Sequence, residues 1–400
     1  MNSPTTRAFM PQSDTFAPVA NPDIRSFRIA IPQKALDDLR HRLLHTRWPD
    51  ELHGVDWNYG IPLGYLKELV QYWCATYDWR VHEARLNELP QFTTELDGHN
   101  VHFVHVRSRE AGALPLIITH GWPGSIVEFQ NIVAPLSDPR SHGGDPADAF
   151  HLVIPSIPGY GFSGPTRQTG WDVRRVATAW AELMNRLGYA RYGAQGGDWG
   201  SMISRELGLI DRKRVLGVHL NTLSAPVSKD PVELAELTHV ERARSEVAAN
   251  FRAEGLGYGR IQSTRPQTLA YGLTDSPVGQ LAWIAEKFKE FTDSCDRPED
   301  AVDRDQLLTN VMIYWLTATA GSSARLYYES TEAWGPPEPS TVPTGIAVFP
   351  REVSPPIRRF AEQTNNIVHW SEFERGGHFA AMEAPELLVP DIRAFFRRFR

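Results

Sequence analysis

The sequence predicts an α/β fold, with a mostly parallel sheet and helices on both of its faces. Short apolar segments typical of strands alternate with amphipathic helices over residues 96–224 and return within 341–400. The intervening segment, 225–340, carries mainly helical signals, which is typical of a lid inserted over an active site. Residues 22–95 precede the alternating pattern. We therefore expect a helical N-terminal extension, a core in two parts and a helical lid.

The predicted N-terminal extension contains two amphipathic helices. The first covers residues 33–47, starts after Pro32 and ends at Trp48-Pro49, because the residue before a proline resists the α region. The second covers about 62–78 and repeats apolar residues at i, i+3, i+4 and i+7. Both precede any strand signal, so we expect them to pack on the later core. The polar, proline-rich residues 1–21 indicate a flexible arm.

The core begins with a hairpin over 92–107, whose turn is Asp97-Gly98. A helix face around Trp180 to Leu187 follows further along, with Gly188 placed to end it. In the lid, helices are expected over 281–291 and 307–320. The remaining predicted strands cover 114–119, 150–154, 191–195, 215–220, 345–349 and 367–373.

Composition excludes several classes of protein. With 400 residues, of which 42% are hydrophobic and 22% charged, the chain has the composition of a soluble globular protein. A net charge of −7 and the lack of a basic run disfavour nucleic-acid binding. No stretch approaches the roughly 18 apolar residues of a membrane span, and no signal peptide is recognisable. Two cysteines, Cys74 and Cys295, fit a cytoplasmic location. Neither metal-ligand spacing nor a phosphate-binding loop occurs, so we expect no cofactor.

The stretch Gly-Gly-Asp-Trp-Gly at residues 196–200 has the pattern of a nucleophile elbow, with a carboxylate where most such enzymes carry serine. Gly196 and Gly200 allow a strand and a helix to approach closely around a sharp turn. Asp198 would then be lifted into the pocket. A carboxylate there displaces a leaving group from an sp³ carbon and forms an alkyl ester.

Hydrolysis of such an ester needs a base and an acid that orients it. His378 follows the last predicted strand, and Glu352 follows the strand before it. The order nucleophile, acid, histidine is the one expected for this fold. Glu374 and Glu383 are competing acids, but Glu374 is very near His378 in sequence and Glu383 is expected on the final helix.

The loop His-Gly-Trp-Pro at 120–123 follows an early strand. In this fold such a loop gives one backbone N–H to an oxyanion hole, and the residue after the nucleophile gives the other. Those residues are Trp122 and Trp199. The same pattern alone would also fit a tight turn, and the sequence leaves open whether Pro123 is cis.

Together these motifs resemble the microsomal-type epoxide hydrolases of the α/β-hydrolase superfamily, from about residue 22 to the C-terminus. In that family the acid is a glutamate, which favours Glu352, and an N-terminal domain wraps onto the core. Mammalian members carry a membrane anchor that this chain lacks, so we expect a soluble protein. The matching segments are residues 120–123, 159–163, 196–200, 349–352 and 376–381, together with Trp48-Pro49.

The resemblance implies two lid tyrosines that hydrogen-bond the epoxide oxygen and help to protonate it. Tyr258 matches the first and Tyr327 the second. Tyr328, next to Tyr327, and Tyr271 leave the register open.

The predicted activity is the hydrolysis of a small-molecule epoxide to a vicinal diol by water, in detoxification or secondary metabolism. A haloalkane dehalogenase shares the aspartate nucleophile, and a non-catalytic binding protein on the same scaffold is the rival of another class. A serine hydrolase is disfavoured because no Gly-x-Ser-x-Gly occurs. A homodimer is compatible with the sequence but does not follow from it.

Overall fold

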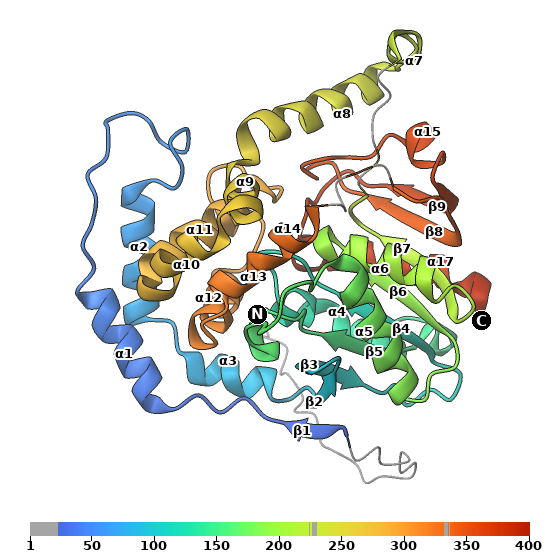
Figure 1. Ribbon diagram of the computed structural model, residues 1–400, viewed down its shortest axis with the longest axis horizontal. Helices are drawn as coiled ribbons and strands as arrows, with labels where there is room; N and C mark the ends of the chain where they lie inside the picture. The colour runs from blue at the N-terminus through green and yellow to red at the C-terminus, as the bar shows by residue number, and fades with distance from the viewer. Residues whose placement is uncertain (1–22, 224, 226–229, 332–334, 336) are drawn as a thin grey trace, which may run out of the picture.

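A single nine-stranded sheet forms the centre of the computed structural model, which describes residues 23–223, 225, 230–331, 335 and 337–400 (Figure 1). The strand order is β1-β2-β3-β5-β4-β6-β7-β8-β9. The first three strands and the β3–β5 pair are antiparallel, and all other pairs are parallel. The arm predicted over residues 1–21 lies outside the described residues. The strands are β1 (Arg25–Phe27), β2 (Gln91–Leu96), β3 (His99–Val106), β4 (Leu114–Thr119), β5 (Phe150–Pro155), β6 (Tyr192–Gly196), β7 (Val215–Leu220), β8 (Ser340–Val348) and β9 (Asn365–Glu372).

Helices cover both faces of the sheet, which confirms the predicted fold class. α5 (Val173–Arg186) and α6 (Asp198–Ile210) pack together on one face, and α4 (Gln130–Ser137) and α17 (Pro385–Phe396) pack together on the other (Figure 1). The predicted stop of α5 is present, because Gly188 has a left-handed φ of 79° just after the helix. Apolar side chains from both helix layers and from the strands form one continuous core.

A helical lid connects β7 to β8. Among the described residues of this segment no strand occurs. α8 projects away from the body of the molecule, and α9 packs against α14 near the sheet (Figure 1). A short helix, α16 (Ala380–Glu383), follows β9. The lid helices are α7 (Pro231–Ala235), α8 (His239–Asn250), α9 (Gly257–Thr264), α10 (Pro266–Asp275), α11 (Pro277–Glu290), α12 (Arg304–Leu316), α13 (Ala320–Ser323) and α14 (Arg325–Glu329).

The N-terminal segment differs from the prediction in two ways. β1 precedes the first helix and pairs with β2, so the segment begins as an edge strand of the sheet. The predicted two helices are three: α1 (Gln33–Leu44), α2 (Leu63–Ala75) and α3 (Trp79–Leu86). The Thr46 hydroxyl donates to the Leu43 carbonyl over 2.9 Å, which takes up a last-turn carbonyl and ends α1 before Trp48.

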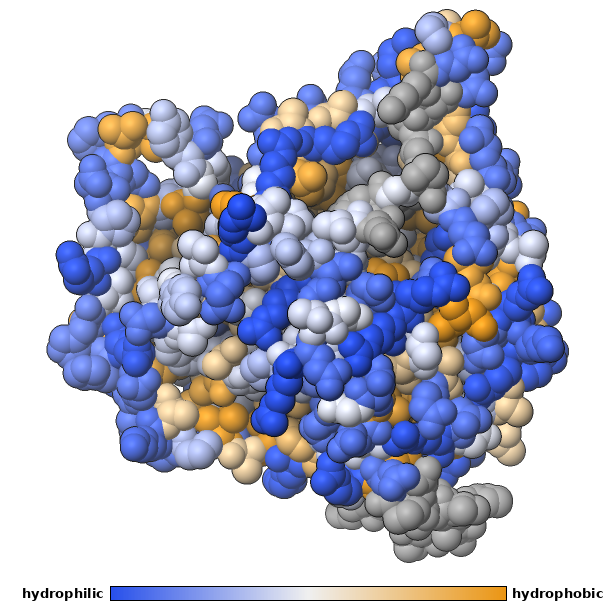
Figure 2. All heavy atoms as spheres, viewed as in Figure 1, coloured by the Kyte–Doolittle hydropathy of each residue, from blue (hydrophilic) through white to orange (hydrophobic). Residues whose placement is uncertain are grey.

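These N-terminal helices reach the lid as well as the core. Tyrosine hydroxyls of this segment contact α12 and the turn before it: Tyr72 donates to Asp305 over 2.8 Å, and Tyr65 donates to Glu299 over 3.1 Å. Figure 1 shows α1 and α2 alongside the lid helices. The N-terminal segment therefore contacts α12 and the turn before it, which belong to the lid. The face of the molecule in Figure 2 is mainly hydrophilic, in agreement with an apolar core.

Candidate active site

The elbow at residues 196–200 joins β6 to α6 through a sharp turn. Asp198 has φ of 50°, a left-handed conformation that is strained for a residue other than glycine. A Cβ on Gly196 would lie 2.2 Å from the Gly200 carbonyl oxygen, and one on Gly200 would lie 1.9 Å from the Thr119 oxygen. Only glycine fits at both positions, as the sequence indicates. The turn lifts Asp198 above the carboxyl end of β6.

The loop after β4 meets this carboxylate. The Trp122 backbone N–H donates to Asp198 Oδ1 over 2.8 Å, and the Trp122-Pro123 peptide is cis. A Cβ on Gly121 would lie 2.2 Å from Asp198 Oδ1, so the loop backbone approaches the carboxylate directly. Trp199 occupies the first turn of α6, where backbone N–H groups lack partners within the helix. The structure therefore places the Trp122 N–H on the carboxylate, and Trp199 follows Asp198 in the first turn of α6.

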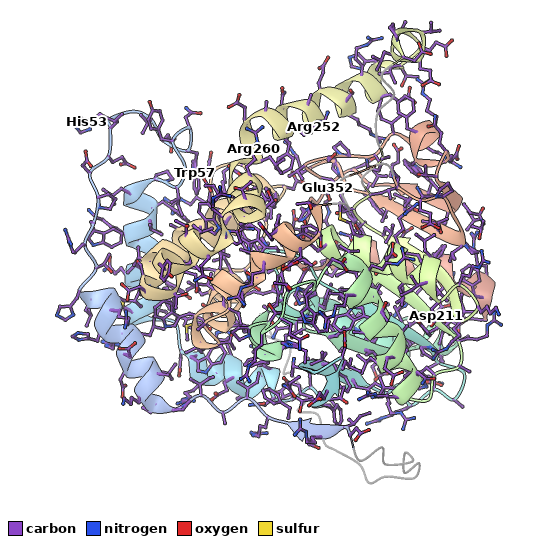
Figure 3. All side chains as sticks on the ribbon, viewed as in Figure 1. His53, Trp57, Asp211, Arg252, Arg260 and Glu352 are labelled. Carbon is purple, nitrogen blue, oxygen red and sulfur yellow. The ribbon has the colours of Figure 1, made fainter. Side chains whose placement is uncertain are left out.

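His378 joins Asp198 to Glu352. Its Nε2 lies 3.5 Å from Asp198 Oδ2, and its Nδ1 lies 3.0 and 3.1 Å from the two oxygens of Glu352. The backbone N–H of His378 donates to the Phe291 carbonyl over 2.8 Å, which fixes the residue from the lid side. Glu352 lies in the interior between the lid helices and the sheet (Figure 3). These three predicted residues thus form one array, in which His378 and Glu352 are hydrogen-bonded and Asp198 lies next to the imidazole.

The Glu352 carboxylate is held by two further donors. The Thr222 hydroxyl donates to its Oε2 over 2.6 Å, and the Val353 N–H donates to its Oε1 over 2.8 Å. Burial alone would raise the pKa of Glu352, but the charge of His378 and these hydrogen bonds lower it. Thr222 follows β7, and no local pattern in the sequence distinguishes it from other threonines.

The negative charges of Glu352 and Asp198 also influence the pKa of the His378 imidazole. Burial alone would lower the pKa of His378, but the Glu352 and Asp198 carboxylates outweigh burial and raise it well above the ordinary value. Esterification of Asp198 would remove one of these two negative charges. The imidazole would then give up its proton more readily in the ester than in the free protein.

The two competing acids do not contact the His378 ring. Glu383 is half-buried and accepts the N–H groups of Asp293 and Phe379 over 2.7 and 2.9 Å. Glu374 is exposed. Of these three acids, Glu352 is the one that contacts the imidazole, and its role as the orienting acid stays a prediction.

The lid places Tyr258 and Tyr327 over the carboxylate. The Tyr258 ring stacks on the Trp122 indole, with centroids 4.9 Å apart and planes 12° apart. The Tyr327 ring meets the Trp199 indole edge-on at 4.7 Å. Tyr327 is 2% exposed, whereas its neighbour Tyr328 is 53% exposed and Tyr271 is 71% exposed. Of these tyrosines, only Tyr258 and Tyr327 face the site.

Burial keeps both phenols protonated. It raises the pKa of Tyr258, and the negative charge of Asp198 raises it further. Burial likewise raises the pKa of Tyr327 well above the ordinary value, with added contributions from Tyr258 and Asp198. At neutral pH both side chains can donate a hydrogen bond to an oxygen above Asp198.

Sequence reasoning missed a row of polar side chains on α12 that fixes the loop after β4. Asn310 Nδ2 donates to the Pro123 carbonyl over 2.7 Å, and the Tyr314 hydroxyl donates to the Gly124 carbonyl over 2.7 Å. Gln306 Nε2 donates to the Val127 carbonyl over 2.9 Å. Their spacing of four residues was the available signal, because it places all three on one face of a helix.

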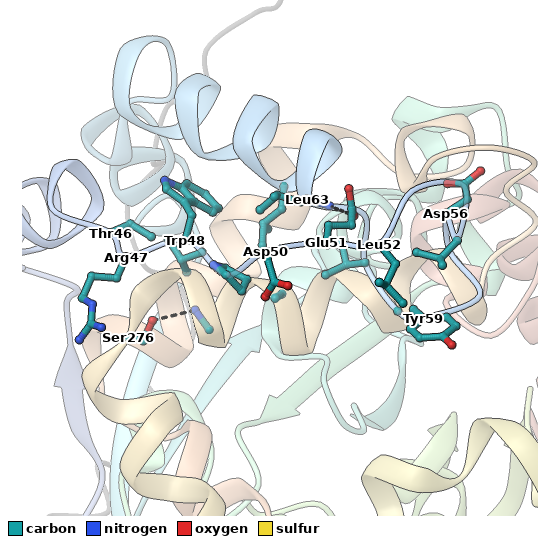
Figure 4. Close-up of a pocket in the computed structure, with 18 residues that line it drawn as sticks. Thr46, Arg47, Trp48, Asp50, Glu51, Leu52, Asp56, Tyr59, Leu63 and Ser276 are labelled. Atoms are coloured by element: carbon teal, nitrogen blue, oxygen red, sulfur yellow. Dashed lines mark hydrogen bonds between the residues drawn. The ribbon is translucent and has the colours of Figure 1, made fainter.

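A groove of about 520 Å³ lies elsewhere, between the segment at residues 46–66 and α11 (Figure 4). Glu51 accepts the Leu63 N–H in its wall over 2.6 Å, and Trp48 and Tyr59 also line it. None of the residues of the array lines this groove, so it is separate from the site.

Within the described chain, no group of three histidine, cysteine or acidic side chains could hold a metal ion. None of the described helices has the length and apolarity needed to cross a bilayer.

The fold and the elbow define a hydrolase of the α/β-hydrolase class. Residues 115–259 match the family model for the alpha/beta hydrolase fold, and residues 24–129 match the model for the epoxide hydrolase N terminus. A Stigmatella aurantiaca protein named "Putative epoxide hydrolase" is 47% identical over 94% of this chain and 86% of its own length. Epoxide hydrolase 1 of Sus scrofa is 36% identical over 93% of this chain and 88% of its own length.

Solved structures agree with these sequence matches. The Aspergillus niger epoxide hydrolase superimposes with a TM-score of 0.83 at 34% identity, covering 94% of this chain and 96% of that one. The juvenile hormone epoxide hydrolase of Bombyx mori superimposes with a TM-score of 0.81 at 31% identity, covering 94% of each chain. The chain belongs to the epoxide hydrolase family, as its motifs predict.

Proposed function

We propose that this epoxide hydrolase opens an epoxide to a vicinal diol in two steps, through an alkyl ester on Asp198. The proposal rests on one arrangement of side chains. The buried, protonated phenols of Tyr258 and Tyr327 lie above the Asp198 carboxylate, and the His378–Glu352 pair lies next to that carboxylate. A nucleophile, a proton donor for the leaving oxygen and a base for the second step then share one pocket.

In the first step Asp198 attacks a ring carbon. Its Oδ1 is held by the Trp122 N–H, so Oδ2 is the oxygen that forms the new C–O bond. The ring C–O bond breaks, and a proton from Tyr258 or Tyr327 passes to the ring oxygen. An alkoxide is a poor leaving group, and this proton removes the developing charge.

In the second step His378 takes a proton from water, whose oxygen attacks the ester carbon of Asp198. The charge that develops on Oδ1 meets the N–H groups of Trp122 and Trp199. The diol then leaves, taking its proton from His378. The second hydrogen of the water, left on the new Asp198 carboxyl group, passes to the tyrosinate, which restores both the carboxylate and the phenol. Glu352 stabilises the imidazolium that exists between these two proton transfers.

The indole rings favour an epoxide over an alkyl halide as substrate. In a haloalkane dehalogenase with this elbow, the indole after the nucleophile holds the halide. Here both indoles, of Trp122 and Trp199, pack against the tyrosine rings. The tyrosines therefore occupy the side of the pocket where the leaving group departs. They donate protons to that group rather than binding a halide.

We expect incubation with styrene oxide to yield the vicinal diol and incubation with a chloroalkane of similar size to yield no halide. Diol is measured by chromatography and halide with an ion-selective electrode. Halide release without diol formation would instead make the protein a dehalogenase. The aromatic walls around Asp198 favour an apolar epoxide. A cytoplasmic location, a homodimer and a role in detoxification or secondary metabolism stay predictions.

Replacing one lid tyrosine, in Tyr258→Phe or Tyr327→Phe, is expected to slow ester formation roughly 10- to 100-fold, because one of two proton donors is lost. The double variant is expected to lose on the order of 10³-fold or more. Rates come from single-turnover quenching with styrene oxide. Tyr328→Phe is the matched control, since this exposed neighbour should keep the full rate. An equal loss in Tyr328→Phe would show that the assignment of the two phenols is wrong.

A further inference from the structure

Glu128 is a buried carboxyl beside the reaction centre that the mechanism above does not use. It lies in the 3-10 helix Ile126–Phe129, just after the loop that carries Trp122, and it is 6% exposed. A Cβ on Gly124 would lie 2.6 Å from Glu128 Oε2 and 3.4 Å from the Gly121 carbonyl oxygen. The carboxyl is therefore folded against the inner side of the loop whose other end contacts Asp198.

The surroundings of Glu128 are rigid and belong to the site. The row of side chains on α12 fixes the carbonyls of Pro123, Gly124 and Val127, which precede Glu128 in the chain. The 3-10 helix also packs against α16, which directly follows His378. Glu128 is thus held between the loop of the oxyanion hole and the segment that carries the base.

Glu128 differs from Glu383, another acid whose charge interacts with His378. Both Glu383 oxygens accept backbone N–H groups. Burial has the largest effect on the pKa of Glu128, and no hydrogen bond contributes to the shift. A buried carboxyl without a protein partner is costly, and water commonly supplies the missing hydrogen bond.

His378 also has a hydrogen-bonding atom that a water could contact. Within the described residues, its Nε2 is buried without a hydrogen-bond partner, and the 3.5 Å to Asp198 Oδ2 is too long for a good hydrogen bond. Burial raises the pKa of Glu128 to about 8, the charge of His378 lowers it, and those of Asp198 and Glu383 raise it. At neutral pH the carboxyl keeps its proton, so it cannot compete with the imidazole as the base.

We infer that Glu128 holds the hydrolytic water, accepting one of its hydrogen bonds while His378 Nε2 accepts the other. The inference rests on the proposed two-step function. In the second step the water gives one proton to His378, its oxygen bonds to the ester carbon of Asp198, and its remaining hydrogen stays directed at Glu128. No proton moves to or from Glu128. Glu128 orients a lone pair of the water oxygen toward the ester carbon. Glu128 therefore matters for ester hydrolysis and not for ester formation.

The test compares Glu128→Leu with Glu128→Gln, using styrene oxide, acid quenching and mass spectrometry of the intact chain. In the leucine variant, ester decay is expected to slow roughly 10- to 100-fold while ester formation stays within about threefold of the wild type. The glutamine variant keeps a carbonyl acceptor, so its decay is expected within about threefold to fivefold of the wild-type rate. Thermal unfolding of each variant is measured alongside, and Glu128→Met replaces the leucine variant if that one does not fold.

Three results would overturn the inference: wild-type ester decay in the apolar variants, equal slowing of both steps, or a glutamine variant as slow as leucine. His378→Gln separates these results from a failure of the proposed function. If that variant accumulates no ester on Asp198, the two-step function itself is wrong. If it accumulates ester while the apolar Glu128 variants turn over normally, only the role of Glu128 is wrong.

Discussion

Asp198→Ala is expected to abolish diol formation, with a loss on the order of 10⁴-fold or more in kcat. The carboxylate supplies the nucleophilic oxygen, and neither the His–Glu pair nor the tyrosines can replace it. Alanine also removes the acceptor of the Trp122 N–H. Diol formation from styrene oxide is the measurement, and no mass increase should appear on the intact protein.

The control for this variant lies at the other end of the same helix. Asp211 caps the C-terminus of α6 and accepts the Tyr192 hydroxyl over 2.7 Å, away from the elbow. Asp211→Ala should keep diol formation, although it removes a hydrogen bond that holds α6. Unchanged activity in Asp198→Ala, beside a folded and active Asp211→Ala, would exclude Asp198 as the nucleophile.

The elbow could be predicted from the sequence because local steric constraints require its glycines. Gly196 and Gly200 stand where any side chain would collide with backbone one turn or one strand away. The strands β4 and β7, which lie on either side of β6, could also be predicted from the sequence. Both are short apolar runs between loop signals, and both begin and end at the predicted residues. Such features depend on a few neighbouring residues, and a single sequence contains them.

Other features depend on contacts between distant segments, which a single sequence does not contain. β1 is three residues long and has no alternation to detect; it is a strand only because β2 offers an edge. Tyr327 and Tyr328 are equivalent in sequence, and the face of α14 that turns toward Trp199 decides between them. Glu128 is a single charge in an apolar run, and its importance depends on its place beside Asp198 and His378.

His378→Gln is expected to trap the intermediate. Glutamine cannot take a proton from water, so ester hydrolysis should fall on the order of 10⁴-fold, while ester formation by Asp198 continues. Mass spectrometry after mixing with styrene oxide should show an increase equal to one substrate, and digestion should locate it on the peptide that contains Asp198. One equivalent of epoxide is consumed, and diol release stops.

The matched control is His369→Gln on β9. His369 also pairs with a carboxylate, through Nε2 to Asp391 Oδ1 at 2.7 Å, but it lies outside the array. This variant should turn over without a stable adduct, which would show that a histidine–carboxylate pair as such does not determine ester lifetime. Consumption of many equivalents of epoxide by His378→Gln without an adduct would mean that water opens the ring directly. Asp198 would then act as a base, because its Oδ2, 3.5 Å from the histidine, could orient a water as well as attack a carbon.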